Sequence, residues 1–592
     1  MPCKATRRQR LELGVEPALT PAWAGARQWR VLNVGADSSA HFLRIRHAWR
    51  ADPQRPRMLH YVVICGKSFQ NRCDDADLKP LAEQLDAQLW GLLPGFHRLV
   101  FEDGQVLLTV CVGELQTLLK QQQFEADSVL LNTPSLASAD TLYTVKAIAR
   151  LCRRGSTFVA THSDATLQAA LRQCGFEINA SDTLQAVYNP AWQPKKSRVH
   201  TQPTTCVVIG AGLAGAAVAN SLARRGWAVT VLDAASQPAS GASSLPAGLL
   251  VPHTSPDDSP LSRLSRAGVR ITLQQARAVL KHGSDWGHTG VLQRDLEGDS
   301  LNLPPAWAVD PPQAASDWCY TASPKTLAAA GLPPDSTALW HAQAGWVKPA
   351  ALVRAWLAAP GIAWRGGARV AQLRPTNGLG GGWQVLDAAD KVLARADLVV
   401  LAAGHASQSL AAAAGAVPPD LRAIRGQVTF GLQKDSDYLL PAKLPIFPIN
   451  GNGGLIPTIT TPDGPMWLMG ASYERDAKQP TLKQQDHADN LARLQTLLPQ
   501  AADALTDQFR GEHARGWAGI RCATPNRLPL VMPLQTPDSA GQVWLCTGMG
   551  SRGLSFAALC AELLAALLHA EPLPVERRLA QSLLAAKPTL QK

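Results

Sequence analysis

Three glycines near the middle of the chain have the spacing of a dinucleotide-binding turn. They are Gly210, Gly212 and Gly215, in the sequence GAGLAG, and they follow the apolar segment 206–209. In such a motif the first glycine permits a tight turn, the second lets a pyrophosphate approach the backbone, and the third lets the next helix pack closely on the strand. The N-terminus of that helix offers N–H groups and a positive dipole end to phosphates. This segment therefore predicts binding of a dinucleotide.

A carboxylate follows at the distance that such a site requires. Asp233 lies 18 residues after Gly215, at the end of a second predicted strand, 227–232, and a helix is expected between them over 215–225. An acid in this place accepts a hydrogen bond from the adenosine ribose. An arginine at this position would favour a cofactor with a 2′-phosphate, and the acid in this chain disfavours one.

Further glycine-rich segments bear on whether the dinucleotide is NAD or FAD. Small residues form the loops GASS (241–244) and PAGLL (246–250), and a later strand ends at Gly404. The turn GMGSRG (548–553) leads into a helix, whose N-terminus can stabilise negative charge on a reduced flavin. The residues expected to contact the cofactor are Gly210, Gly212, Gly215, Asp233, Gly241, Ser243, Gly248, Val370, Gly404, Gly550 and Gly553.

These stretches carry a family resemblance. Residues 206–568 resemble FAD-dependent amine oxidoreductases of the D-amino-acid oxidase and glycine oxidase type, and more closely the C-terminal half of the MnmC family of bifunctional tRNA-modification enzymes. The matching stretches are RRGWAVTV, GWVKPAALVRAWL, RGQV, GASY, GIRCATPNRLP and GSRGLSFAALCAELLAA. The resemblance implies an FAD-binding Rossmann domain with an inserted α+β substrate subdomain. The FAD is expected to be non-covalent, because no Cys or His in GASS resembles an attachment point.

The resemblance also implies a reaction. The family oxidatively removes the carboxymethyl group from 5-carboxymethylaminomethyl-2-thiouridine at the tRNA wobble position, leaving an aminomethyl group and releasing glyoxylate. Arg521 matches an arginine that holds the substrate carboxylate in glycine-oxidase-like enzymes, and Arg552 beside the flavin turn is a second candidate. A guanidinium suits this task because its planar fork donates two parallel hydrogen bonds to a carboxylate. We expect Arg425 of RGQV to position backbone near the flavin.

Three other side chains near these motifs have open roles. Tyr473 fits either the pocket or a packed core. His253 and His405 lie in loops near the predicted flavin, where hydrogen-bonded loop residues are commoner than general bases. Amine oxidation by hydride transfer does not require such a base.

The N-terminal part resembles the S-adenosylmethionine-dependent methyltransferase half of the same family over residues 29–192. Apolar strands alternate there with helical segments, which is typical of a Rossmann-like α/β fold. The expected strands are 29–34, 59–64, 106–112, 128–131 and 156–161, and the expected helices include 140–152 and 165–174.

The positions that a methyltransferase needs depart from the family pattern. After Gly35, Asp37 and Ser39 stand where the family has glycines. Gly66 and Lys67 follow the second strand, where an acid should bind the cofactor ribose. Asn132 replaces the acid of the family's D-G-F-x-P motif, and Glu114 remains as a candidate acidic contact. We therefore expect this half to be inactive, and S-adenosylmethionine is a doubtful cofactor.

Length and composition set the outer limits. The chain has 592 residues, of which 46% are hydrophobic and 17% charged, which excludes a disordered chain, a collagen and a small disulfide scaffold. The polar, basic segment 190–204 contains three prolines, which is typical of a linker. The predicted domains are 1–189, methyltransferase-like, and 205–592, the oxidoreductase.

The charge and the cysteines indicate partners and compartment. The net charge is +11, and residues 1–60 hold eleven Lys/Arg against four Asp/Glu, which suits a polyanion such as tRNA but also a solvated basic tail. The eleven cysteines are dispersed without C-x-x-C spacing, and no leader or 18-residue apolar run is evident. We expect a cytoplasmic monomer that binds neither metal nor membrane.

Three alternatives stay open at this point. The protein could be the full bifunctional enzyme that also methylates the amine, or a free glycine or D-amino-acid oxidase that never touches RNA. It could also be a tRNA-binding protein in which the flavin is only structural.

Overall fold

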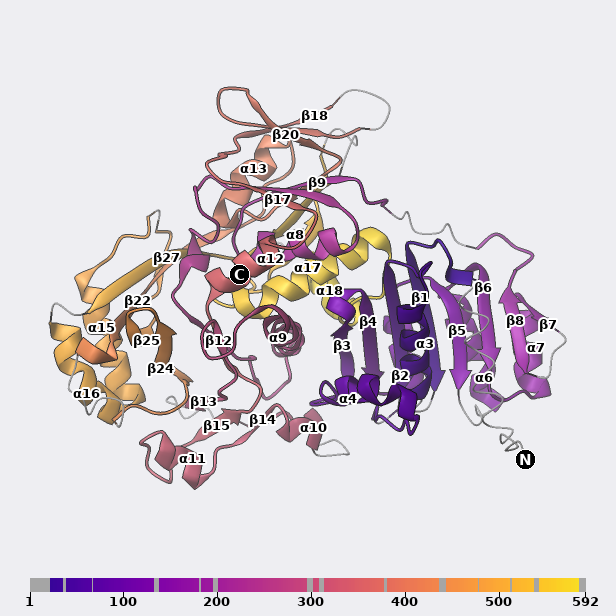
Figure 1. The fold of residues 1–592 in the computed structure, drawn as a ribbon, viewed down its shortest axis with the longest axis horizontal. Helices are drawn as coiled ribbons and strands as arrows, with labels where there is room; N and C mark the ends of the chain where they lie inside the picture. The colour runs from indigo at the N-terminus through magenta and orange to yellow at the C-terminus, as the bar shows by residue number, and fades with distance from the viewer. Residues whose placement is uncertain are drawn as a thin grey trace, which may run out of the picture. The chain divides into compact units, whose positions relative to one another are not determined.

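The chain folds into two compact units (Figure 1). The computed structural model describes residues 22–35, 39–66, 68–132, 138–179, 183–194, 201–294, 302–307, 313–376, 381–435, 443–477, 479–511, 514–536 and 542–584. The first unit comprises 1–202 with 309–314 and 565–580, and the second unit comprises 203–308, 315–564 and 581–592. The predicted boundaries differ from this division in assigning 565–580 to the oxidoreductase.

The first unit is built on one mixed sheet. Its centre is parallel, in the order β4-β2-β1-β5-β6, with antiparallel β3 at one edge and antiparallel β8 and β7 at the other. All five strands expected from the sequence are confirmed, and the three antiparallel strands are additional. The strands are β1 (Gln28–Gly35), β2 (Met58–Cys65), β3 (Gly95–Phe101), β4 (Val106–Val112), β5 (Ala126–Asn132), β6 (Cys152–Ala160), β7 (Phe176–Asn179) and β8 (Leu184–Tyr188).

Different helices cover the two faces of this sheet. Side chains of α3 and α4 join the odd-numbered residues of β1 and β2 in one core, while α5, α6 and α7 pack on the even-numbered residues. The alternation of helices on both faces is the Rossmann-like arrangement expected from the sequence. The helices are α3 (Ser39–Ala51), α4 (Lys79–Asp86), α5 (Leu115–Gln121), α6 (Ser138–Ala149) and α7 (Ala165–Gln173).

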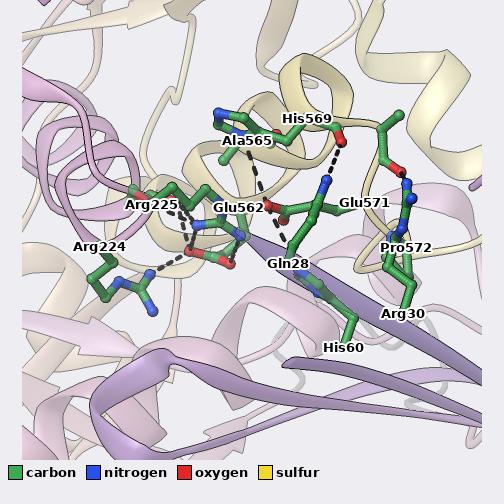
Figure 2. A network of polar contacts seen from close by, with 12 residues as sticks. Gln28, Arg30, His60, Arg224, Arg225, Glu562, Ala565, His569, Glu571 and Pro572 are labelled. Carbon is green, nitrogen blue, oxygen red and sulfur yellow. Dashed lines mark hydrogen bonds and ion pairs between the residues drawn. The ribbon is translucent and has the colours of Figure 1, made fainter. Parts of the chain in front are cut away.

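A segment from the far end of the chain completes the first unit. Side chains of the sheet donate to its backbone: Gln28 to the His569 carbonyl at 3.0 Å (Figure 2), and Arg98 to the Pro572 carbonyl at 2.7 Å. Glu571 is 1% exposed, with a carboxylate oxygen 3.6 Å from His60 Nε2. Residues 565–580 are thus part of the folded core of the first unit.

Some basic residues of the N-terminal region are structural. Arg30 is buried and donates to Asp127 at 3.0 Å, and Arg46 is buried beside Glu102 with 2.6 Å between nitrogen and oxygen. Arg30 also donates to the Ala570 carbonyl at 3.3 Å. These two charges are therefore not available to a polyanion, and residues 1–21 lie outside the described residues.

The second unit contains a dinucleotide-type sheet. Its order is β17-β10-β9-β21-β29-β28, with all pairs parallel except β28 with β29. The expected strands 206–209 and 227–232 and the expected helix 215–225 correspond to β9, β10 and α8. The elements are β9 (Thr205–Ile209), α8 (Leu213–Arg224), β10 (Ala228–Leu232), β17 (Ile362–Arg365), β21 (Leu398–Leu401), β28 (Leu530–Pro533) and β29 (Gln542–Thr547).

A nine-stranded sheet in the same unit follows the order β14-β15-β13-β23-β24-β25-β22-β26, with β27 also paired to β22. Helices α15 and α16 pack their apolar side chains on it. The elements are β13 (Val291–Arg294), β14 (Cys319–Thr321), β15 (Ala338–His341), β22 (Arg422–Leu432), β23 (Ile449–Gly451), β24 (Gly453–Thr461), β25 (Gly464–Gly470), β26 (Glu474–Arg475), α15 (Gln484–Leu497), α16 (Pro499–Arg510) and β27 (Arg515–Ala523).

Two small sheets and several helices complete the described chain. In the described ranges we find no helix with the length and apolarity needed to cross a membrane. The small sheets are β11 (Gly248–Leu250), β12 (Trp286–Gly287) and β16 (Gly345–Val347), and β18 (Gln372–Pro375), β19 (Trp383–Leu386) and β20 (Val392–Ala396). The helices are α9 (Pro260–Val279), α10 (Gln313–Ser316), α11 (Pro324–Ala329), α12 (Pro349–Leu357), α13 (Ser407–Ala413), α17 (Gly553–His569) and α18 (Arg577–Leu584).

A buried ion cluster fixes α17 to α8 within the second unit. Glu562 is 2% exposed and accepts hydrogen bonds from Ser221 at 2.7 Å, from Arg225 at 3.1 Å and from Arg224 (Figure 2). Burial alone would raise the pKa of Glu562, but the charges of Arg225 and Arg224 outweigh it and hold the pKa below its ordinary value. The carboxylate is therefore ionised in the folded protein at neutral pH.

We expect Glu562→Gln to lower the free energy of unfolding by about 3–5 kcal/mol at neutral pH, because it removes one partner of a buried ion cluster. A lowered folded-state pKa contributes stability above the unfolded value of about 4.5, and this contribution is lost as the pH falls below it. The difference between wild type and variant should therefore shrink in acid. Thermal unfolding at several pH values measures it, with the exposed Asp503→Asn as control. Equal midpoints at neutral pH would contradict this role.

Candidate active site

The glycine turn after β9 is closed so tightly that side chains are excluded. Gly210 has a φ of +108°, and a Cβ there would lie 2.5 Å from the Ala402 carbonyl oxygen. A Cβ at Gly215 would lie 1.8 Å from the Gly210 carbonyl oxygen. At Gly212 a Cβ would approach the Ser243 Oγ to 3.1 Å, and the same oxygen accepts from the Leu213 N–H at 3.0 Å. The glycine spacing in the sequence thus has a steric basis.

The Asp233 carboxylate holds the turn in place. Its two oxygens accept from the backbone N–H groups of Ala211 at 2.7 Å and of Ala235 at 2.9 Å. The side chain also lines the cavity described next. Asp233 therefore connects the glycine turn to the end of β10, and its predicted bond to a ribose stays a prediction.

One cavity of about 970 Å³ gathers the predicted site residues. Of the thirteen residues proposed from the sequence, twelve line it, and Gly215 lies beneath the turn instead. Segments far apart in the sequence supply them, from the ends of β9, β10 and β21 to the turn before α17. The twelve are Gly210, Gly212, Asp233, Gly241, Ser243, Gly248, Val370, Gly404, Arg521, Gly550, Arg552 and Gly553.

Arg521 is a half-buried cation that forms no ion pair with a carboxylate of the described residues. It lies on β27, opposite Ile424 of β22, and its guanidinium donates to the Ser472 carbonyl at 3.1 Å. Burial lowers its pKa, and the nearby Tyr473 acts in the opposite direction. A charge held this way in a cavity suits a negatively charged ligand group.

Gly426 makes room for that guanidinium. A Cβ at Gly426 would lie 1.6 Å from Arg521 Nη2, so any side chain would displace the arginine. The glycine of the RGQV motif on β22 is needed because the Arg521 side chain of the neighbouring strand β27 occupies the space beside it. No local pattern indicates this contact.

Arg425, the first residue of RGQV, belongs to a different network. It is 1% exposed, lies 2.7 Å from Asp486 and 3.3 Å from Glu474, and donates to the Thr481 carbonyl at 2.7 Å. These contacts tie β22 to β26 and to α15. Arg425 therefore holds backbone segments of the nine-stranded sheet and α15 together, and it does not line the cavity, so its expected role near the flavin stays a prediction.

Arg552 lies on the turn that leads into α17. The turn contains Gly548 and Gly550, with φ values of +77° and +57°. Burial lowers the pKa of Arg552, and the nearby charge of Arg527 adds to this effect. No carboxylate partner for Arg552 is present in the described part of the chain.

The remaining candidates differ in their surroundings. Tyr473 is 57% exposed, which excludes a packed core, and it does not line the cavity. His405 lines the cavity. His253 Nδ1 lies 2.9 Å from the Ser262 Oγ, and its pKa is lowered, first by burial and then by the charge of Arg552.

Residues that sequence reasoning missed also line the cavity. Trp517 of β27 donates its indole N–H to the Ser244 Oγ at 2.9 Å, which joins the nine-stranded sheet to the loop after β10. Ile520 and Asn450 line the cavity from β27 and β23. Asn450 belongs to no motif of the sequence, and Trp517 and Ile520 lie beside or within GIRCATPNRLP without a predicted role; the pairing of distant strands brings all three to the cavity.

In the first unit the candidate methyltransferase residues have structural partners. Glu114 caps α5, accepting from the N–H groups of Gln116 at 2.8 Å and Thr117 at 2.6 Å. Asn132 ends β5 and accepts from the Thr161 hydroxyl at 3.4 Å, and Ser39 begins α3 and donates to Asn71 at 3.1 Å. Asp37 and Lys67 lie outside the described residues.

Known proteins share this organisation. A family of FAD-dependent oxidoreductases matches residues 205–567, and a family of S-adenosyl-L-methionine-dependent methyltransferases matches residues 76–185. The glycine oxidase of Geobacillus kaustophilus has the same fold, with a TM-score of 0.51 and 20% identity over 66% of this chain and 100% of its own. Fold and cavity define the second unit as an FAD-dependent oxidoreductase of this class.

Full-length relatives then identify the family. The tRNA 5-methylaminomethyl-2-thiouridine biosynthesis bifunctional protein MnmC of Polaromonas naphthalenivorans is 51% identical, over 96% of this chain and 91% of its own. The protein of that name from Polaromonas sp. strain JS666 is 52% identical, over 95% of this chain and 92% of its own. The chain belongs to the MnmC family.

We expect Gly215→Ala to weaken flavin binding by about tenfold or more, because a methyl group there collides with the Gly210 carbonyl and forces α8 away from β9. Flavin absorbance per mole of purified protein measures the effect. Asn220→Ala, on the same helix, is the matched control and should keep its flavin. Full flavin content in the Gly215 variant would contradict this packing.

Proposed function

We propose that the second unit oxidises the 5-carboxymethylaminomethyl group of a wobble uridine in tRNA, with or without a 2-thio group, and leaves a 5-aminomethyl group. The observation that carries the proposal is the Arg521 guanidinium, which lines the cavity without a carboxylate partner among the described residues. The names of the relatives support the tRNA substrate. We propose that the enzyme acts as a monomer in the cytoplasm.

The cavity fits FAD by its shape and its donors. The turn at Gly210 and Gly212 and the N-terminus of α8 would hold the pyrophosphate, and Asp233 would face the adenosine ribose. The turn at Gly550 and the start of α17 would lie at the flavin ring. When bound, FAD would take up a hydride, which carries two electrons, from the carbon between amine and carboxylate; the amine would lose a proton, and water would split the resulting imine into an aminomethyl group and glyoxylate.

The residues of this chain hold the substrate for that step. Arg521 binds the carboxylate through two parallel hydrogen bonds, and this fixes the neighbouring methylene group. The Ser472 carbonyl and the bare backbone of Gly426 fix the guanidinium itself. The Arg521 guanidinium is charged before the substrate enters, and its partial burial costs free energy. The ion pair formed with the substrate carboxylate offsets that cost.

We propose that the first unit does not transfer methyl groups. The methyltransferase family matches from residue 76 onward, after β1 and β2, which would carry the glycine turn and the ribose-binding acid. Glu114 serves as a helix cap, and Asn132 cannot supply the negative charge that favours an amine. This unit instead contributes to tRNA docking.

A basic hollow on the first unit supports a docking role. Exposed Arg27, Arg55 and Arg57 line it, together with small or uncharged residues. The Arg55 guanidinium stacks on Trp49, 4.5 Å from the ring centroid. Such a surface binds phosphates without reading sequence.

The first test uses tRNA that carries the carboxymethylaminomethyl group. Mixed anaerobically with the enzyme, it should bleach the flavin, and mass spectrometry of its nucleosides should show the aminomethyl product. Arg521→Ala should retain FAD but lower kcat/KM by about 100-fold, the loss of one charge-assisted bidentate contact. Its thermal midpoint should not fall, because the substitution removes an uncompensated charge from a partly desolvated place.

Arg422→Ala, an exposed arginine on β22, is the matched control and should behave as wild type. Fast oxidation of free glycine with no effect on tRNA would overturn the proposal. Loss of flavin from the Arg521→Ala variant would instead show that Arg521 has a structural role.

The second test concerns the first unit. Isothermal titration of the full-length protein with S-adenosylmethionine should show no saturable heat, because Gly66 and Asn132 lack the carboxylates that would hold the donor and the amine. A micromolar dissociation constant, or methyl transfer to the aminomethyl product, would contradict an inactive first unit.

A further inference from the structure

Two further arginines, Arg527 and Arg552, lie at or near the cavity that Arg521 lines. Arg552 lines the cavity from the turn before α17, and Arg527 is exposed on the turn that follows β27. The two turns are packed together: the Gly550 N–H donates to the Cys522 carbonyl at 2.7 Å, and Ala523 and Met549 form an isolated bridge.

The turn that carries Arg527 is held by its own hydrogen bonds. The Thr524 hydroxyl donates to the Leu528 carbonyl at 2.6 Å, and the Asn526 side chain accepts from the Leu528 N–H at 3.0 Å. Arg527 has a φ of +62°, and its N–H donates to the Thr524 carbonyl at 3.2 Å. A Cβ at Gly548 would lie 2.8 Å from Thr524 Cγ2, so the turn also packs directly on its neighbour. The position of Arg527 is therefore set by its backbone.

Neither charge is neutralised by an ion pair in the described part of the chain. The charge of Arg527 lowers the pKa of Arg552, and both charges lower the pKa of His253, so the three groups lie near one another. A carboxylate that acts on His253 is Asp257, which is exposed and accepts from the Ser255 hydroxyl at 2.6 Å. Two like charges without partners on adjoining turns form an anion-binding arrangement.

We propose that Arg527 and Arg552 bind a backbone phosphate of the nucleotide whose modified base side chain enters the flavin cavity. This inference rests on the proposed function, in which Arg521 takes the substrate carboxylate. A free amino acid has no second anion to offer this pair. The pair would therefore let the enzyme prefer a nucleotide-borne glycine unit over glycine itself.

The experiment compares substrates that differ in their phosphates. 5-Carboxymethylaminomethyluridine as a nucleoside, the same residue within a trinucleotide, and substrate tRNA are assayed with wild type and Arg527→Asn. Asparagine adopts a positive φ readily, so the variant removes the charge without straining the turn. Arg395→Asn, at an exposed position on β20, is the control.

We expect Arg527→Asn to raise KM for the trinucleotide and for tRNA by about tenfold, with kcat and the nucleoside KM unchanged. The slope of log KM against log salt should fall by about 0.7, the value for one lost phosphate contact on a single strand. A purely structural role for Arg527 would not change the salt dependence. Flavin content and the thermal midpoint of the variant verify its folding, and Arg527→Gly provides a second unstrained variant.

An unchanged KM and salt slope for tRNA would overturn the phosphate proposal while leaving the proposed oxidation intact. An equal rise in KM for the nucleoside would also overturn it. Failure of the wild-type enzyme to oxidise any of the three substrates would instead refute the proposed function.

Discussion

The second unit depends on one constraint: the Arg521 cation lines a cavity and has no carboxylate partner in the described part of the chain. Water solvates a guanidinium strongly, so placing Arg521 on β27 at the cavity costs free energy that the rest of the sheet must offset. The offset comes from the long antiparallel pairing of β22 with β27, from the space left by Gly426, and from the carbonyl of Ser472. These contacts fix the guanidinium in the place where we propose that it binds a carboxylate.

The same stretch of backbone also holds the flavin turn. Cys522 follows Arg521 on β27, and its carbonyl accepts from the Gly550 N–H at 2.7 Å. The strand that carries Arg521 therefore anchors the turn at the start of α17. A shift of β27 would move substrate site and flavin turn together, which keeps their separation constant.

Local spacing was enough to predict the dinucleotide turn, because Gly210, Gly212, Gly215 and Asp233 act within a single β-α-β segment. The same holds for five of the strands in the first sheet, whose apolar runs are short and continuous. The role of Gly426 and the bond from Trp517 to Ser244 could not be predicted this way. Both depend on segments that are distant in sequence, and neither residue type identifies its partner.

The C-terminal segment has a consequence for synthesis on the ribosome. Residues 565–580 belong to the first unit, yet they are translated roughly 370 residues after its sheet is complete. At about 5–20 residues per second this is a delay of roughly 20–75 seconds. During that time Gln28, Arg30 and Arg98 lack the backbone carbonyls that they bind in the finished protein. The first unit therefore reaches its full native structure only after most of the second unit has been synthesised.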